Sequence, residues 1–318
     1  MLRFILQRLG LAALSVWAVC TIVFFIAALA PGDPAEIAAG GKSLSPAALA
    51  RTRHEFGLDR PLGVRYVAYV WDALHGNLGK SFYDREPVTH FFARALPNTA
   101  ILAVTAIGLA LLVGIAVGLL AALRPNSVLD RLLMASILTG VTLPNFVLAP
   151  VLILLLAVKL GWLPVAGWSD PITGAIQPEY VVLPAVVLAA RPAALTARLT
   201  RASLLETLRQ DYIRTARAKG LSPARILFRH ALKNAFLPVL TTAGVSFGYL
   251  LSGSFVVETI FTVPGVGYES IHSLSTRDYS LIQGTTLLLA VIFVTVNLIV
   301  DILYALLDPR VKVTEGAA

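Results

Sequence analysis

The sequence predicts an all-α integral membrane protein with six transmembrane helices. Of its 318 residues, 57% are hydrophobic and only 14% are charged, whereas about a quarter of the residues of a soluble domain are charged. Long uncharged runs alternate with segments that carry most of the charge. The single cysteine, Cys20, lies in an apolar run, which excludes an internal disulfide framework.

Five uncharged runs are long enough to cross a bilayer core, which takes about 20 apolar residues in a helix. They are Leu9 to Gly32, Ala95 to Leu123, Leu132 to Val158, Asn234 to Val257 and Tyr279 to Val300. A sixth run, Tyr180 to Ala190, is short and is followed by Arg191 and Pro192. It becomes long enough if the helix continues to about Thr200, and the even count then places both termini on one side.

The first run has two interpretations. Arg3 and Arg8 precede it, and "ALA" at 28–30 resembles the cleavage site of a signal peptide. However, Pro31 follows directly and the run is longer than the apolar region of most signal peptides. We therefore expect an uncleaved first helix.

Residues 33–94 are predicted to form a large extracytoplasmic loop region. Within "RPLGVRYVAYVWDALHG" the apolar positions Val64, Val67, Val70, Trp71 and Leu74 recur at helical spacing. This pattern predicts a short amphipathic helix. It lies either on the membrane or a partner, or against the outer ends of the spans.

The distribution of charge predicts that both termini are cytoplasmic. With the N-terminus inside, the inner segments carry 16 Lys and Arg residues and the outer segments carry 10, in accord with the positive-inside rule. Eight of those 10 lie in residues 33–94, where seven acidic residues nearly cancel them. The basic excess therefore orients the chain in the bilayer, and we expect no nucleic-acid partner.

Several motifs evoke enzymes but lack the required context. "GVSFG" at 244–248 matches the G-x-S-x-G of a nucleophile elbow at Ser246, which needs a strand-turn-helix setting. An uncharged span must instead be helical, and the same residues form a G-x-x-x-G that lets helices approach closely. "GNLGKS" at 76–81 and "GGKS" at 40–43 lack the spacing of a P-loop. We expect no enzyme, metal site or cofactor in this chain; an intramembrane hydrolase built on Ser246 is the alternative.

The stretch "DYIRTARAKGLSPARILFRHAL" at 211–232 is strongly basic, with four arginines and one lysine against one aspartate. Gly220 suits the end of a helix, and Ser222 followed by Pro223 suits the start of the next. The stretch therefore predicts a helix-turn-helix hairpin between two spans. It is either a docking element for a protein or an anchor to anionic lipid.

Around Gly220 the chain resembles the cytoplasmic "EAA" loop of ABC-importer permeases. Arg214-Thr215-Ala216 stands where that family has Glu-Ala-Ala, so the acidic residue is absent, as in the dipeptide, oligopeptide and nickel importers. Further stretches similar to this subgroup run along nearly the whole chain: "LAPGDP" at 29–34, "FGLDRPLGVRY" at 56–66, "GNLGKSF" at 76–82, "LPNTAILA" at 96–103, "ETIFTVPGVG" at 258–267, "RDYSLIQG" at 277–284 and "DILYALLDPRVK" at 301–312.

The resemblance implies a type I ABC-importer permease in a bacterial or archaeal cell membrane. Residues 1–32 would hold the cytoplasmic N-terminus and first helix, 33–94 the extracytoplasmic loop region, and 95–318 a permease core with five spans and a coupling loop at 201–233. Its partners would be a second homologous permease, two ABC ATPase subunits that bind ATP and magnesium, and an extracytoplasmic solute-binding protein. The implied cargo is a di- or oligopeptide, with nickel or glutathione as alternatives. A different class of function, an exporter or secretion scaffold, stays open.

Two sets of candidate site residues follow. By resemblance, the ATPase-coupling residues are Asp211, Arg214, Thr215, Ala216, Arg217, Ala218 and Gly220. Uncharged polar residues in the third and fifth spans, with Pro144 expected to break the third, suit a path for varied peptides, although hydrogen bonds between helices explain them equally well. With Arg191, the path candidates are Asn145, Arg191, Thr242, Ser246 and Ser254. Arg191 either reaches toward the cytoplasmic headgroups or faces the channel.

Overall fold

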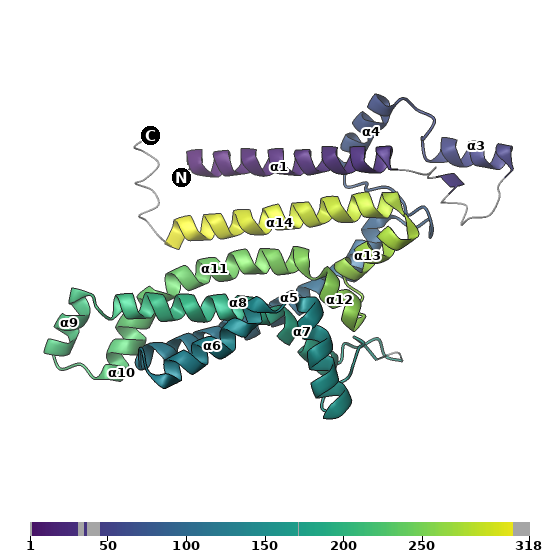
Figure 1. Cartoon of the computed structure of the whole chain (residues 1–318). Helices are drawn as coiled ribbons and strands as arrows, with labels where there is room; N and C mark the ends of the chain where they lie inside the picture. The colour runs from purple at the N-terminus through teal and green to yellow at the C-terminus, as the bar shows by residue number, and fades with distance from the viewer. Residues whose placement is uncertain (1, 31–34, 37–44, 171, 308–318) are drawn as a thin grey trace. The chain divides into compact units, whose positions relative to one another are not determined.

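Helices form nearly all of the regular structure (Figure 1). The computed structural model describes residues 2–30, 35–36, 45–170 and 172–307. No β-strand forms within these ranges. Backbone contacts divide the chain into two compact units: unit 1 is residues 1–100 with 251–298, and unit 2 is residues 101–250 with 299–318.

Four helical segments are long and apolar enough to cross a membrane: Ile5–Leu29, Val88–Leu123, Pro178–Thr207 and Tyr279–Ile302. Two further segments pass the same test only as bent pairs: Val128–Thr142 with Asn145–Lys159, and Pro223–Phe236 with Pro238–Leu251. The described residues therefore contain four such helices, or up to six if each bent pair is one span. The chain is thus an all-helical protein with several apolar helices.

Unit 1 contains the helices that begin and end the chain. They are α1 (Leu2–Leu29), α3 (Pro46–Glu55), α4 (Leu62–Leu74), the start of α5 (Val88–Leu123), α12 (Phe255–Phe261), α13 (Val266–Thr276) and most of α14 (Tyr279–Leu307). Local signals set several bounds. Ser45 Oγ accepts from the N–H of Ala48 at the start of α3, and Pro46 takes its first position. Left-handed residues end α12 at Thr262 and α13 at Arg277.

The predicted amphipathic helix is present as α4, but the face that packs on α1 differs from the predicted stripe. Tyr66 bonds Thr21 at 2.8 Å, and the rings of Tyr66 and Tyr69 lie 5.4 and 5.5 Å from that of Phe24. Burial raises the pKa of the Tyr69 hydroxyl above its ordinary value. Four of the predicted stripe residues are instead exposed: Val64, Val67, Trp71 and Leu74.

Unit 2 is organised around α8 (Pro178–Thr207), most of whose apolar window is buried. The rest of α5, α6 (Val128–Thr142), α7 (Asn145–Leu152), the π-helical turn η1 (Ile153–Lys159) and most of α11 (Leu232–Gly253) belong to the same unit. Glycines let the neighbours approach α8 closely. A Cβ added to Gly114 or Gly118 of α5, or to Gly140 of α6, would lie 2.5–2.8 Å from a backbone carbonyl oxygen of α8.

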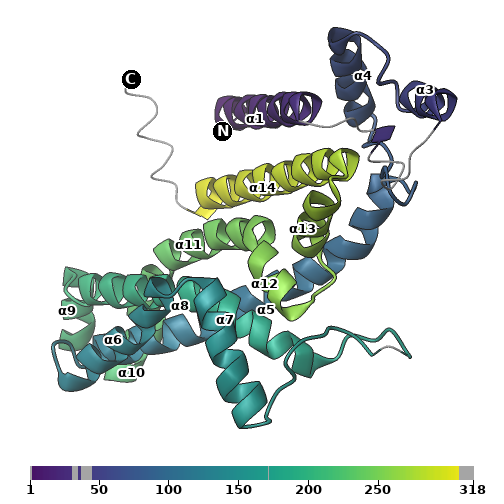
Figure 2. The same cartoon turned by 45° about the vertical axis from the view of Figure 1, so that its right-hand side comes forward.

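Two expectations about the spans are confirmed. The helix that begins before Tyr180 continues through Arg191 and Pro192 and passes Thr200, ending at Thr207. The run Leu132 to Val158 is broken at Pro144, where α7 turns away from α6 by 111° (Figure 2). The break has a local cause, because the residue before a proline disfavours the α conformation, and Leu143 is extended with ψ 121°.

Candidate functional site

The basic stretch folds as the predicted helical hairpin. It consists of α9 (Asp211–Ala218), a turn, α10 (Pro223–Arg225) and the π-helical turn η2 (Ile226–Ala231), which leads directly into α11. Gly220 in the turn has φ +74°, a conformation that favours glycine. Ser222 is extended and precedes Pro223 at the first helical position, but its side chain makes no capping hydrogen bond. The hairpin thus joins the end of α8 to the start of α11.

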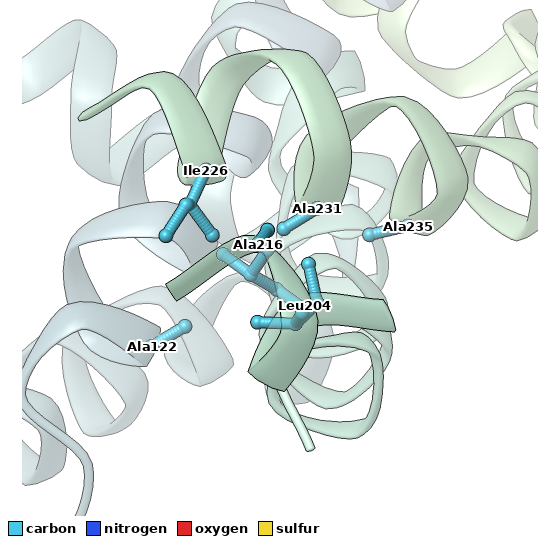
Figure 3. Packing of buried hydrophobic residues seen from close by; sticks show 7 residues of the cluster. Ala122, Leu204, Ala216, Ile226, Ala231 and Ala235 are labelled. Carbon is cyan, nitrogen blue, oxygen red and sulfur yellow. The ribbon is translucent and has the colours of Figure 1, made fainter. Parts of the chain in front are cut away.

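A cluster of small and branched apolar side chains holds the hairpin together (Figure 3). This hairpin core consists of Ala122, Leu204, Ile213, Ala216, Ile226, Ala231 and Ala235. Ile213 is 0% exposed and Ala216 is 7% exposed. Because the cluster contains residues from the ends of α5 and α8 and from η2 and α11, α9 is packed against both helices that it connects.

The opposite face of α9 and the turn is exposed and charged. Six of the seven candidate coupling residues lie there: Asp211, Arg214, Thr215, Arg217, Ala218 and Gly220. Arg214 pairs with Asp211 at 3.3 Å, but their side chains are 77% and 93% exposed, so this ion pair contributes little stability. The seventh residue, Ala216, lies on the buried face. The hairpin therefore presents a cationic surface on an apolar base.

Two of the path candidates, Thr242 and Ser246, lie on one face of α11, and a third, Arg191, lies beside that face. Thr242 and Ser246 are spaced by one helical turn, and Tyr249 follows on the same face. The guanidinium carbon of Arg191, near the middle of α8, lies 5.9 Å from the centre of the Tyr249 ring, within cation–π range. Val245 and Tyr249 are exposed in the isolated chain.

The other two path candidates lie elsewhere. Asn145 is the first residue of α7, directly after the break at Pro144, and is half-buried. Ser254 belongs to unit 1, where it is buried and hydrogen-bonded to Glu258. Ser246 lies within the continuous helix α11, and Gly244 packs against Val300 of α14. This is the helix-packing setting expected for the G-x-x-x-G, and it differs from that of a nucleophile elbow.

Sequence reasoning missed a buried carboxylate network around Glu258, whose side chain is 0% exposed. One carboxylate oxygen accepts from the hydroxyls of Ser254 and Thr99, the latter at 2.9 Å. The other accepts from the N–H groups of Gly267 and Tyr268 at 2.7 and 3.1 Å. This Glu258 network joins "LPNTAILA" to "ETIFTVPGVG". A Cβ on the intervening Gly265 would lie 2.5 Å from atoms of both Thr99 and Glu258, which explains the glycine.

A second buried carboxylate joins two more of the quoted stretches. Asp278, 2% exposed, accepts from the Ser81 hydroxyl and from the N–H of Phe82 at 3.1 Å. Its other oxygen accepts from the N–H of Leu281 at 3.1 Å, in the first turn of α14. "GNLGKSF" is therefore a turn held on "RDYSLIQG". One sequence signal could have pointed to both buried carboxylates: Glu258 and Asp278 each flank an apolar run and lie inside one of the quoted motif stretches.

Comparisons with known proteins identify the family. Residues 114–313 match the model of the binding-protein-dependent transport system inner membrane component, and residues 1–103 match the corresponding N-terminal model. The chain belongs to this family. The predicted resemblance is thereby confirmed: the chain is the inner membrane component of a binding-protein-dependent transport system.

Curated relatives match nearly full length. The di/tripeptide transport system permease protein DppB of Pseudomonas aeruginosa is 42% identical, covering 98% of this chain and 99% of the relative. The oligopeptide transport system permease protein OppB of Salmonella typhimurium is 40% identical over 98% and 100%. The glutathione transport system permease protein GsiC of Salmonella paratyphi A is 39% identical over 98% and 99%.

The fold also matches a solved transporter. The inward-facing MetNI methionine ABC transporter has a chain that aligns with a TM-score of 0.56 at 19% identity, over 68% of this chain and 95% of the other. This likeness shows the fold of an ABC-importer permease. Among the described residues, no group of three or more His, Cys, Asp or Glu side chains could hold a metal ion.

Proposed function

We propose that this chain is one of two related permease subunits of an ATP-driven importer and that it lines a path for di- or oligopeptides. An extracytoplasmic binding protein delivers the cargo, and two ATPase subunits that hold ATP and magnesium dock on the permeases. The relatives named for di/tripeptides and oligopeptides support the cargo class. The glutathione relative keeps glutathione as the second candidate. Ligand identification on the partner binding protein separates the two, and a nickel chelate is the third possible outcome.

The observation that carries the proposal is the construction of the hairpin. Its exposed face offers Arg214 and Arg217 to an acidic or polar partner surface, while Ile213 and Ala216 pack inward on α8 and α11. A force applied to α9 is therefore transmitted to α8 and α11 through the hairpin core. With both termini and the hairpin on the cytoplasmic side, closure of the ATPases would tilt α8 and α11, as alternating access requires.

Charge reversal at the hairpin tests this proposal. In the reconstituted transporter, Arg214→Glu with Arg217→Glu should reduce ATP-dependent peptide uptake at least about tenfold, because reversing two contacts at a charged interface costs several kcal/mol. Membrane insertion should stay normal, since neither side chain belongs to the hairpin core. The matched control is Arg51→Glu with Arg60→Glu, two exposed arginines of the 33–94 region. Normal uptake in the hairpin variant would show that α9 is not the coupling element.

The path proposal rests on Arg191 and the adjacent face of α11. A charge near the middle of a span is costly and usually faces a wet cavity or the bundle interior. Arg191 lies near the middle of α8 and beside the exposed Tyr249. In this arrangement Arg191 attracts the carboxylate of a passing peptide or of the second permease.

Arg191→Gln tests the path. Uptake should fall while assembly and ATPase docking are preserved, and Arg51→Gln, at an exposed arginine of α3, is the control. Near-normal uptake by Arg191→Gln would favour the alternative in which the side chain reaches the cytoplasmic headgroups. Ser246→Ala should leave transport largely intact; loss of a hydrolytic activity in that variant would support the hydrolase instead.

A further inference from the structure

A cavity of about 540 Å³ opens between α6 and α8 within unit 2. Arg131 and Met134 of α6 and Arg198 and Arg201 of α8 contribute to its walls. The remaining polar lining comes from Asp130 and from Asn126, in the turn between α5 and α6. The hairpin core begins next to this cavity, because Arg201 lies about one turn before Leu204 on α8.

The cavity carries an excess of positive charge. Its single acidic side chain, Asp130, is fully engaged: it accepts from Nε and Nη2 of Arg201 at 2.7 and 2.6 Å and from the N–H of Asn126 at 2.8 Å. This bidentate pair, whose carboxylate is buried, fixes one wall. Arg131 and Arg198 are exposed, and neither forms an ion pair with another described residue. The lining therefore carries three arginines against one carboxylate, which leaves two positive charges in excess.

Exposed apolar side chains of α6 adjoin the cavity. Leu138 and Val141 lie seven residues beyond Arg131 and Met134, hence two turns further along the same face of α6, and both are exposed in the isolated chain. A basic pocket beside an exposed apolar helix face matches an amphiphile with an anionic head and an apolar tail better than it matches a free anion.

We propose that this pocket binds the phosphate headgroup of an anionic phospholipid through Arg131 and Arg198. Basic pockets between membrane helices on the cytoplasmic side bind such headgroups, and Arg suits phosphate because its guanidinium donates in a planar fork. The acyl chains would lie along the exposed apolar residues of α6. A bound headgroup bridges α6 and α8 beside the hairpin core, so it links lipid composition to the coupling hairpin.

The test uses the whole transporter purified and reconstituted in nanodiscs of phosphatidylcholine, with or without phosphatidylglycerol. Native mass spectrometry and a titration with phosphatidylglycerol measure the retained lipid and its affinity. Arg131→Gln with Arg198→Gln should weaken that affinity about tenfold or more, since each basic residue contributes to headgroup binding. Arg51→Gln with Arg60→Gln is the control of equal charge and should bind as the unmodified protein does. Both substituted pairs are exposed, so folding should be preserved.

Two results would overturn the proposal. Equal retention by the Arg131–Arg198 variant and the control would show that the pocket holds no headgroup, including the case in which the second permease covers it. Binding of inorganic phosphate in phosphatidylcholine nanodiscs, with the same dependence on Arg131 and Arg198, would show a free-anion site instead. Lipid retention is measured without transport, so its failure would leave the docking experiment at Arg214 and Arg217 unaffected.

Discussion

The hairpin core of unit 2 consists of apolar side chains, whereas the motif stretches of unit 1 are held by hydrogen bonds to buried carboxylates. In the hairpin core, Ile213 and Ala216 pack with other alanines and leucines and need no polar partner. In the Glu258 network, one side chain accepts from two hydroxyls and two backbone N–H groups. Both regions join segments far apart in the sequence. The hydrogen bonds of the Glu258 network depend on direction, whereas the apolar contacts of the hairpin core do not.

This difference in chemistry indicates a difference in mechanical behaviour. Apolar burial is non-directional and scales with the area removed from water, so α9 can shift slightly against α8 and α11 without losing the contact. Hydrogen bonds weaken steeply with angle, and a buried donor left without an acceptor is costly. We infer that the hairpin tolerates small movements, as a coupling element must, whereas the Glu258 network fixes its loops in one geometry.

The largest expected effect comes from removing the carboxylate at the centre of unit 1. Glu258→Ala removes the acceptor of the N–H groups of Gly267, which is buried, and of Tyr268, which is half-buried; in the first turn of α13 these groups have no carbonyl partner within the helix. Each such donor costs about 1–3 kcal/mol, and the lost packing adds to this, so stability should fall by at least about 3 kcal/mol. Thermal unfolding of the purified chain in detergent measures the loss.

Glu179→Ala is the matched control, because Glu179 is an exposed glutamate in the first turn of α8. Its melting temperature should stay within a degree or two of the unmodified chain, in line with the small effects of surface substitutions. If Glu258→Ala melted at the same temperature as this control, the proposed rigidity of the Glu258 network would be wrong.

The sequence predicts the parts of the fold that depend on local signals. Proline at position 144 and glycine at position 220 act through their own backbone restrictions, so the break after α6 and the hairpin turn follow from neighbouring residues. Periodicity likewise finds α4, but it cannot say which face packs on α1, and Tyr66 turned out to lie on the packed face. The proposal that the hairpin is the coupling element rests on family resemblance rather than on any local pattern.

The carboxylate networks escaped prediction for a different reason. Glu258 and Thr99 are 159 residues apart, and Asp278 and Ser81 are 197 apart. No spacing rule connects positions so distant, and a single acidic residue after an apolar run is also compatible with an exposed loop. Only the three-dimensional arrangement shows that these residues face one another.

A smaller effect on stability is expected in the hairpin core, where Ala216→Trp inserts a large ring among residues that are nearly fully buried. Overpacking of this kind costs about 1–3 kcal/mol, less than the loss of Glu258, because the hairpin can move outward to relieve the contact. That movement displaces α9, so uptake per ATP hydrolysed should fall more than stability does.

Ala218→Trp is the matched control two residues away, on the exposed face. It should keep the melting temperature of the unmodified chain, although it too alters the surface proposed to meet the ATPase. The pair therefore separates the two roles of α9: only Ala216→Trp should lower the melting temperature. Equal melting temperatures for both variants, with coupling intact in Ala216→Trp, would show that the hairpin core does not transmit movement to α8 and α11.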